Sequence, residues 1–177
     1  MMERKIYKIG EIADVVGGGT PSTSINSYWN GNIPWLTPRD LTGYTKMFIS
    51  SGERNITESG LIHSSAKLLP VGSVLLTSRA PIGYVAIANS ELATNQGFKS
   101  LVLNPDLAYN KYIYYWLKNN VDYLQSIGTG TTFGEISGSA VKDLEISLPP
   151  LVTQKAIAEV LSSLDDKIDL LHRQNKT

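Results

Sequence analysis

Residues 148–175 read LPPLVTQKAIAEVLSSLDDKIDLLHRQN. Beyond Pro149 and Pro150, apolar residues recur at steps of four, three, four and three, which is the spacing of a coiled-coil seam. These seam residues are Ile157, Leu161, Leu164, Ile168 and Leu171. The pattern predicts a helix whose apolar stripe packs against a partner helix. Because barely two heptads are present, an amphipathic helix folded back on its own domain is the alternative.

The two prolines separate this helix from the rest of the chain. A length of 177 residues with 42% hydrophobic content fits one domain with its own core, plus an appendage. We therefore divide the chain into a globular domain, residues 1–148, and the start of the long helix, residues 149–177.

The globular part has the texture of an α+β domain. Short apolar runs at residues 74–77, 84–88 and 99–103 are bounded by Pro, Asn and Ser, which is typical of strands. Apolar residues at helical spacing predict a short helix over residues 9–16, ending at a glycine turn, and an amphipathic helix between residues 105 and 128. The expected fold is a curved, loop-rich mixed β-sheet with flanking helices, followed by the coiled-coil-type helix.

Composition argues against several classes of catalytic site. The chain has no cysteine, so thiol nucleophiles, disulfides and cysteine-bound zinc are excluded. The GGGTPS run at residues 17–22 lacks the lysine of a phosphate-binding loop, and the two histidines stand apart in the sequence. Neighbouring carboxylates such as Asp165 and Asp166 point in different directions on a helix. We expect no catalytic residue, metal or cofactor in this chain.

Charge and hydropathy limit the partners. The chain carries 16 basic and 16 acidic residues, whereas a small freestanding nucleic-acid-binding domain usually has a basic excess. There is no signal-peptide pattern and no long apolar stretch, so we expect a cytoplasmic protein without a membrane segment.

Four stretches carry a resemblance to a known family. They are KIGEIADVVGGGTPSTSINSYWNGNIPWLTPRDL at residues 8–41, LLTSRAPIGYVAIA at 75–88, ATNQGFKSL at 93–101, and the helical stretch at 148–175. Together, and in this order, they resemble the specificity subunit of type I restriction-modification enzymes. A full subunit of that family has two target recognition domains, each followed by a long helix. This chain contains one of each, so it resembles a half-subunit or a fragment.

The resemblance implies a function and a set of partners. Each recognition domain of the family reads one half of an interrupted site in double-stranded DNA, and the long helices pair as a spacer. The same helices dock modification subunits, in which S-adenosylmethionine is expected, and restriction subunits are further candidate partners. A natural half-subunit would form a homodimer through the terminal helix. If the modification subunits supply most phosphate contacts, a reader of zero net charge is reasonable.

Residues that suit DNA contacts lie mainly in the predicted loops. Arginine can take guanine or a phosphate, lysine suits phosphates, and short polar or amide side chains suit phosphates and adenine. The candidates are Thr20, Ser22, Thr23, Arg39, Lys46, Arg79, Asn95, Gln96, Lys99, Thr131 and Thr132.

Each candidate also has a structural alternative. Arg39 equally suits an ion pair with Asp40, and Asn95 suits a turn whose side chain bonds the main chain. The lysines suit a solvated surface. Trp29 and Trp35 suit packing under loops better than stacking on bases.

Two rival functions remain. One is an adaptor that oligomerises through its heptad helix and binds no DNA. The other is a hydrolase whose site has no recognisable arrangement of nucleophile and base.

Overall fold

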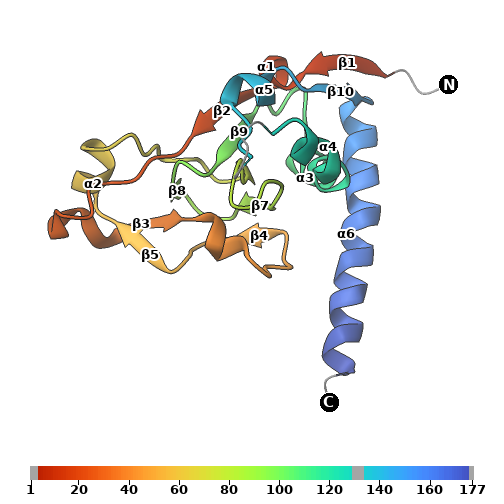
Figure 1. Ribbon diagram of the computed structural model, residues 1–177. Coiled ribbons are helices and arrows are strands. Elements are labelled where there is room, and N and C mark those ends of the chain that lie inside the picture. The colour runs from red at the N-terminus through yellow and green to blue at the C-terminus, as the bar shows by residue number, and fades with distance from the viewer. Residues whose placement is uncertain (1–3, 129–133, 176–177) are drawn as a thin grey trace.

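The computed structural model describes residues 4–128 and 134–175 (Figure 1). These residues form three small sheets with short helices around them, and one long helix at the end of the chain. The predicted α+β fold is confirmed, and the sheets are mixed: β4 and β7 are parallel, as are β3 and β8, whereas the other pairs are antiparallel.

The central sheet has five strands in the order β2-β9-β6-β7-β4. Its middle strands coincide with the three apolar runs of the sequence, because side chains on both faces are buried there. The predictions at 74–77, 84–88 and 99–103 are therefore confirmed. The strands are β2 (Ala13–Gly17), β4 (Phe48–Ile49), β6 (Val74–Leu76), β7 (Val85–Ala88) and β9 (Lys99–Leu103).

A three-stranded sheet, β5-β3-β8, lies beside the central one and carries its own small core. Trp29 and Trp35 are both buried in it, 8% and 3% exposed, so the expectation that they pack under loops is confirmed. The elements are 3₁₀ turn η1 (Asn26–Tyr28), β3 (Trp29–Leu36), 3₁₀ turn η2 (Pro38–Leu41), β5 (Arg54–Ile56), α2 (Glu58–Ile62) and β8 (Ala93–Thr94).

Helices and a two-stranded sheet close the main core. Ile113, Tyr114 and Leu117 of α3 pack with Val74, Leu76 and Leu101 of the central sheet. The predicted helix between 105 and 128 is thus present, but as two pieces joined at Asn120. The elements are β1 (Lys5–Lys8), α1 (Ile9–Ile12), α3 (Asn110–Asn119), α4 (Val121–Ser126), α5 (Gly138–Lys142) and β10 (Glu145–Leu148).

The predicted opening helix is wrong beyond Ile12. Residues Ala13–Gly17 form strand β2, which pairs antiparallel with β9, Ala13 opposite Leu103 and Gly17 opposite Lys99. The apolar residues have helical spacing, but pairing with the buried strand β9 outweighs this local preference for a helix. Val15 and Val16 are also β-branched, which suits a sheet. The glycines that follow therefore end a strand, not a helix.

The long helix α6 (Leu151–Gln174) stands at one side of the molecule. With 24 residues it is about 36 Å long. Its first turns lie beside α3, and it runs away from the β1-β10 sheet (Figure 1).

Gln154 joins this helix firmly to the domain. Its amide accepts from the N–H of Tyr109 at 2.9 Å and donates to the carbonyls of Leu107 and Pro149 at 2.9 and 3.0 Å. The division at residues 148 and 149 stays a prediction, and the first turns of the helix pack as part of the globular core.

Candidate nucleic-acid interface

Tryptophans hold the loop that follows β2. The indole N–H of Trp35 donates to the carbonyl of Gly19 at 2.8 Å, and that of Trp29 donates to the carbonyl of Ser22 at 3.1 Å. The N–H of Gly19 donates in turn to the carbonyl of Thr94 at 2.9 Å. The exposed candidates Thr20, Ser22 and Thr23 are therefore carried on a loop with buried anchors.

Gly18 permits the close approach of this loop to the segment after β8. A Cβ added at Gly18 would lie 1.9 Å from the carbonyl oxygen of Asn95, whereas one added at Gly17 would meet nothing within 4 Å. Across the same junction, the hydroxyl of Thr20 donates to Oε1 of Gln96 at 2.5 Å. The structure thus brings Thr20 and Gln96 together, 76 positions apart in the chain.

The side chain of Asn95 bonds the main chain of a turn, which was the structural alternative to a DNA contact. Its Oδ1 accepts from the N–H of Gly97 at 2.9 Å, closing a local turn. The exposed amide in this segment is that of Gln96.

Arg39 lies in η2, and the neighbouring carboxylate is already engaged. Asp40 accepts from the N–H and hydroxyl of Thr37 at 2.7 and 2.8 Å, and from the N–H of Glu53 at 2.8 Å. Asp40 therefore caps the turn and does not pair with Arg39. Within the described part of the chain, the exposed guanidinium of Arg39 has neither an ion pair nor a hydrogen bond.

The segment at residues 94–99 is the point at which the candidate loops meet. A Cβ at Gly97 would contact Pro38, which places η2 beside it. The carbonyl of Gly97 accepts from the N–H of Ser78 at 2.7 Å, and Lys99 pairs with Gly17 across β9 and β2. We call residues 17–24, 37–41, 78–81 and 94–99 the loop cluster.

Arg79 and Lys99, at the edge of the loop cluster, share one carboxylate. Glu135 lies 3.5 Å from the guanidinium of Arg79 and 3.3 Å from the ammonium of Lys99. Both basic residues are thus in ion pairs in the free chain.

Two groups of candidates fall outside this cluster. Lys46 lines a cleft of about 590 Å³ between the β4 segment and α6, which also contains Lys111, Asp165 and Asp169. Thr131 and Thr132 lie outside the described residues.

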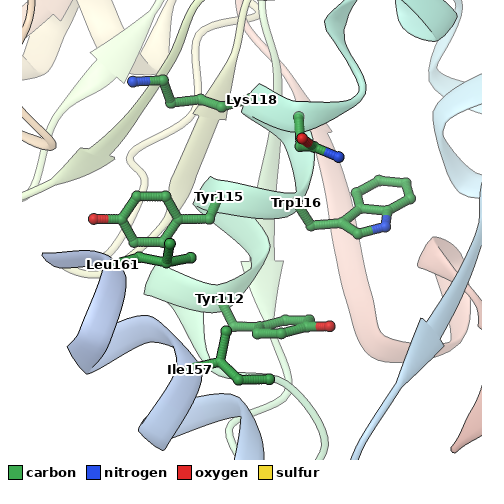
Figure 2. Close-up of a pocket in the computed structure, with 7 residues that line it drawn as sticks. Tyr112, Tyr115, Trp116, Lys118, Ile157 and Leu161 are labelled. Carbon is green, nitrogen blue, oxygen red and sulfur yellow. The ribbon is translucent and has the colours of Figure 1, made fainter. Parts of the chain in front are cut away.

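The seam of α6 is divided in two. Ile157 and Leu161 are half-buried and, with aromatic residues of α3, line an apolar groove of about 420 Å³. Figure 2 shows Tyr112 reaching from α3 toward Ile157, and Tyr115 toward Leu161. Further along the helix the seam residues are about half exposed: Leu164 52%, Ile168 50% and Leu171 46%. Folding back on the domain therefore accounts for the first half of the seam, and the coiled-coil prediction concerns the second.

Tyr115 ties α3 to α6 near the point where the seam becomes exposed. Its hydroxyl donates to Oδ2 of Asp165 at 2.8 Å. Burial, together with this bond to a carboxylate, raises the pKa of Tyr115 far above its ordinary value, so the hydroxyl keeps its proton and remains a donor.

Arg54 is a residue that sequence reasoning missed. Its guanidinium lies 3.6 Å from the ring centroid of Trp29 and 5.5 Å from that of Trp35. It covers the two tryptophans that anchor the loop at residues 19–22. Its position opposite Trp35 in β5 and β3 depends on strand register, for which the sequence carried no clear signal.

The described residues contain neither a candidate metal site nor a membrane-spanning helix. In residues 4–128 and 134–175 there is no group of three or more His, Cys, Asp or Glu side chains arranged to hold a metal ion. Over the same ranges, no helix is long and apolar enough to cross a bilayer.

The fold agrees with comparisons to known proteins. The chain belongs to the type I restriction modification DNA specificity domain family, whose model matches residues 1–177. It is 48% identical over 173 residues to the type I restriction enzyme MjaIX specificity subunit of Methanocaldococcus jannaschii, a match covering 97% of this chain and 40% of that protein. It is 30% identical over 164 residues to the EcoR124I/EcoR124II specificity subunit of Escherichia coli, covering 89% and 40% of the two chains.

Solved structures show the same fold. The HsdS subunit from Thermoanaerobacter tengcongensis matches with a TM-score of 0.71 at 22% identity, covering 97% of this chain and 39% of that one. A chain from a structure on the assembly and conformational transition of a type I R-M system matches with a TM-score of 0.77, also at 22% identity, covering 97% and 40%. The chain spans about 40% of the length of these relatives. The resemblance to type I specificity subunits is confirmed.

Proposed function

We propose that this chain reads one half of an interrupted duplex DNA target for a type I restriction-modification system. The observation that carries the proposal is the loop cluster, in which three segments far apart in the sequence meet a fourth, residues 94–99. Buried tryptophans hold one of these loops, so its polar side chains are preorganised for a ligand.

The side chains of the cluster suit DNA. No carboxylate among the described residues pairs with Arg39, whose guanidinium can donate two hydrogen bonds to guanine or clamp a phosphate. The amide of Gln96 can address adenine, and Thr20, Ser22 and Thr23 suit phosphate oxygens. Arg79 and Lys99 add two cations at the edge of the cluster.

Zero net charge makes the isolated chain a weak phosphate binder, so partners are part of the proposal. Modification subunits, which would hold S-adenosylmethionine, dock on α6 and supply further phosphate contacts. The chemistry then belongs to the partner subunits, and this chain gives them specificity without an active site of its own. Restriction subunits join the same complex.

The exposed half of the α6 seam is the proposed dimer contact. Leu164, Ile168 and Leu171 present an apolar stripe that a second copy of this helix would cover. Two identical readers related by a two-fold axis would recognise a palindromic interrupted site.

The test is the salt dependence of binding to a duplex, with the chain alone and with a cognate modification subunit. We expect the logarithm of the association constant to fall linearly with the logarithm of the salt concentration, and the complex to bind more tightly than the chain. Selection from a randomised duplex pool should then enrich one half-site per reader. An association constant that does not change with salt concentration, or a pool in which no half-site is enriched, contradicts the proposal.

The exposed seam also favours a second function, an adaptor that oligomerises without binding DNA. The adaptor function would be supported if the chain forms a dimer or a complex with modification subunits but binds no duplex in either state.

A further inference from the structure

Glu135 makes one carboxylate the partner of two cations at the edge of the loop cluster. Its Oε2 lies 3.5 Å from a guanidinium nitrogen of Arg79, and its Oε1 lies 3.3 Å from the ammonium of Lys99. Each carboxylate oxygen therefore serves a different cation, as the two non-bridging oxygens of a phosphodiester would.

The main chain holds all three residues in place. Lys99 lies in β9 opposite Gly17, and its side chain is only 15% exposed. Arg79 follows Ser78, whose N–H donates to the carbonyl of Gly97 at 2.7 Å and whose carbonyl accepts from the N–H of Ile136 at 3.0 Å. The last bond fixes the residue next to Glu135. The arrangement is thus set by the sheet and not by three long side chains meeting in solvent.

Carboxylate and phosphodiester each carry one negative charge, so one can replace the other between these two cations. The side chains of Arg79 and Glu135 are 36% and 40% exposed, so a phosphate can reach the site from solvent. A phosphate that binds there must first displace the carboxylate.

We propose that Glu135 is an internal competitor for a DNA phosphate, which occupies the Arg79 and Lys99 site until a duplex displaces it. The inference rests on the proposed function, because it requires the loop cluster to face DNA. Its consequence is lower affinity for every duplex, so that the free chain stays off DNA unless further contacts, such as those of Arg39, compensate.

The test compares Glu135→Gln with wild type on a fluorescent duplex of random sequence, over a series of salt concentrations. The amide keeps the shape and removes the charge. Because two partly exposed ion pairs contribute roughly 0.4 to 2 kcal/mol together, binding should tighten by about 2-fold to 30-fold. The two freed cations should also steepen the salt slope by about 0.9 to 1.8.

Two variants make the comparison decisive. Glu91→Gln changes net charge equally, at an exposed carboxylate outside the loop cluster, and should leave binding near the wild-type value. Glu135→Gln combined with Arg79→Ala should lose most of the gain, because the freed guanidinium is gone. Thermal unfolding of each variant checks that the fold is kept, and Glu135→Ala repeats the test if the amide variant fails to fold.

The outcomes separate the two proposals. If the wild type binds duplex with the expected salt dependence, but Glu135→Gln behaves like Glu91→Gln or binds more weakly, the competitor role is wrong and the DNA-reading function stands. If the wild type shows no duplex binding, alone or with the modification subunit, the proposed function itself fails.

Discussion

The indole nitrogen of Trp35 donates a 2.8 Å hydrogen bond to the carbonyl oxygen of Gly19. Through this bond the core of the three-stranded sheet holds a loop on which Thr20, Ser22 and Thr23 are exposed. The same loop contacts residues 94–95, where the other candidate loops meet. The stability of the domain and the order of its candidate DNA surface are therefore coupled through one buried side chain.

Trp35→Phe should lower the free energy of unfolding by about 1 to 3 kcal/mol, because the buried carbonyl of Gly19 loses its donor. Duplex binding should weaken too, since the loop is less ordered. Trp116→Phe is the matched control: the described residues contain no hydrogen-bond partner for its indole N–H. Chemical denaturation measures the free energy of unfolding of the two variants. Equal losses would show that the hydrogen bond of Trp35 contributes no measurable stability.

Gly18→Ala and Gly17→Ala should differ sharply. The added Cβ at Gly18 would lie 1.9 Å from the carbonyl oxygen of Asn95, so the loop and the residues after β8 must separate. We expect a stability loss of about 1 to 3 kcal/mol, as for other overpacked sites. At Gly17 the methyl group meets nothing within 4 Å and should be tolerated. Thermal unfolding distinguishes the two, and a tolerated Gly18→Ala would refute the close approach.

Arg39→Ala should weaken duplex binding by about 1 to 3 kcal/mol if the guanidinium reads a base, with relaxed preference at one position of the target. Arg4→Ala removes an exposed arginine next to β1, outside the loop cluster, and serves as the control. Selection from a randomised duplex pool measures the preference. Loss of affinity without a change of preference would assign Arg39 to a phosphate, and no change in either would remove it from the interface.

Leu164→Asp with Leu171→Asp should abolish self-association through α6, because two charges would be buried in the seam. Leu170→Asp introduces a charge on the same helix at a residue that is 54% exposed and outside the seam, and should leave association intact. Light scattering coupled to size exclusion gives the mass of each variant, alone and with a modification subunit. A dimer that survives the double change must form through another surface.

The structure explains why some sequence predictions succeeded and others failed. The apolar runs at 74–77, 84–88 and 99–103 became strands because both of their faces are buried, and such runs carry their own signal. Residues 13–16 had helical spacing, yet they pair with β9. The sequence allowed either a DNA contact or an ion pair with Asp40 for Arg39. The ion pair does not form, because the carboxylate of Asp40 caps a turn and accepts from the N–H of Glu53, 13 residues away.

Local periodicity in the sequence was sufficient to establish the long helix, its apolar seam and the buried strands, because each repeats at the spacing of its own backbone geometry. Tertiary structure decided which half of the seam α3 covers, which loops meet at residues 94–99, and that Arg79 and Lys99 share Glu135. These outcomes depend on contacts between residues far apart in the chain, and spacing along one segment holds no information about which distant segment will pack against it.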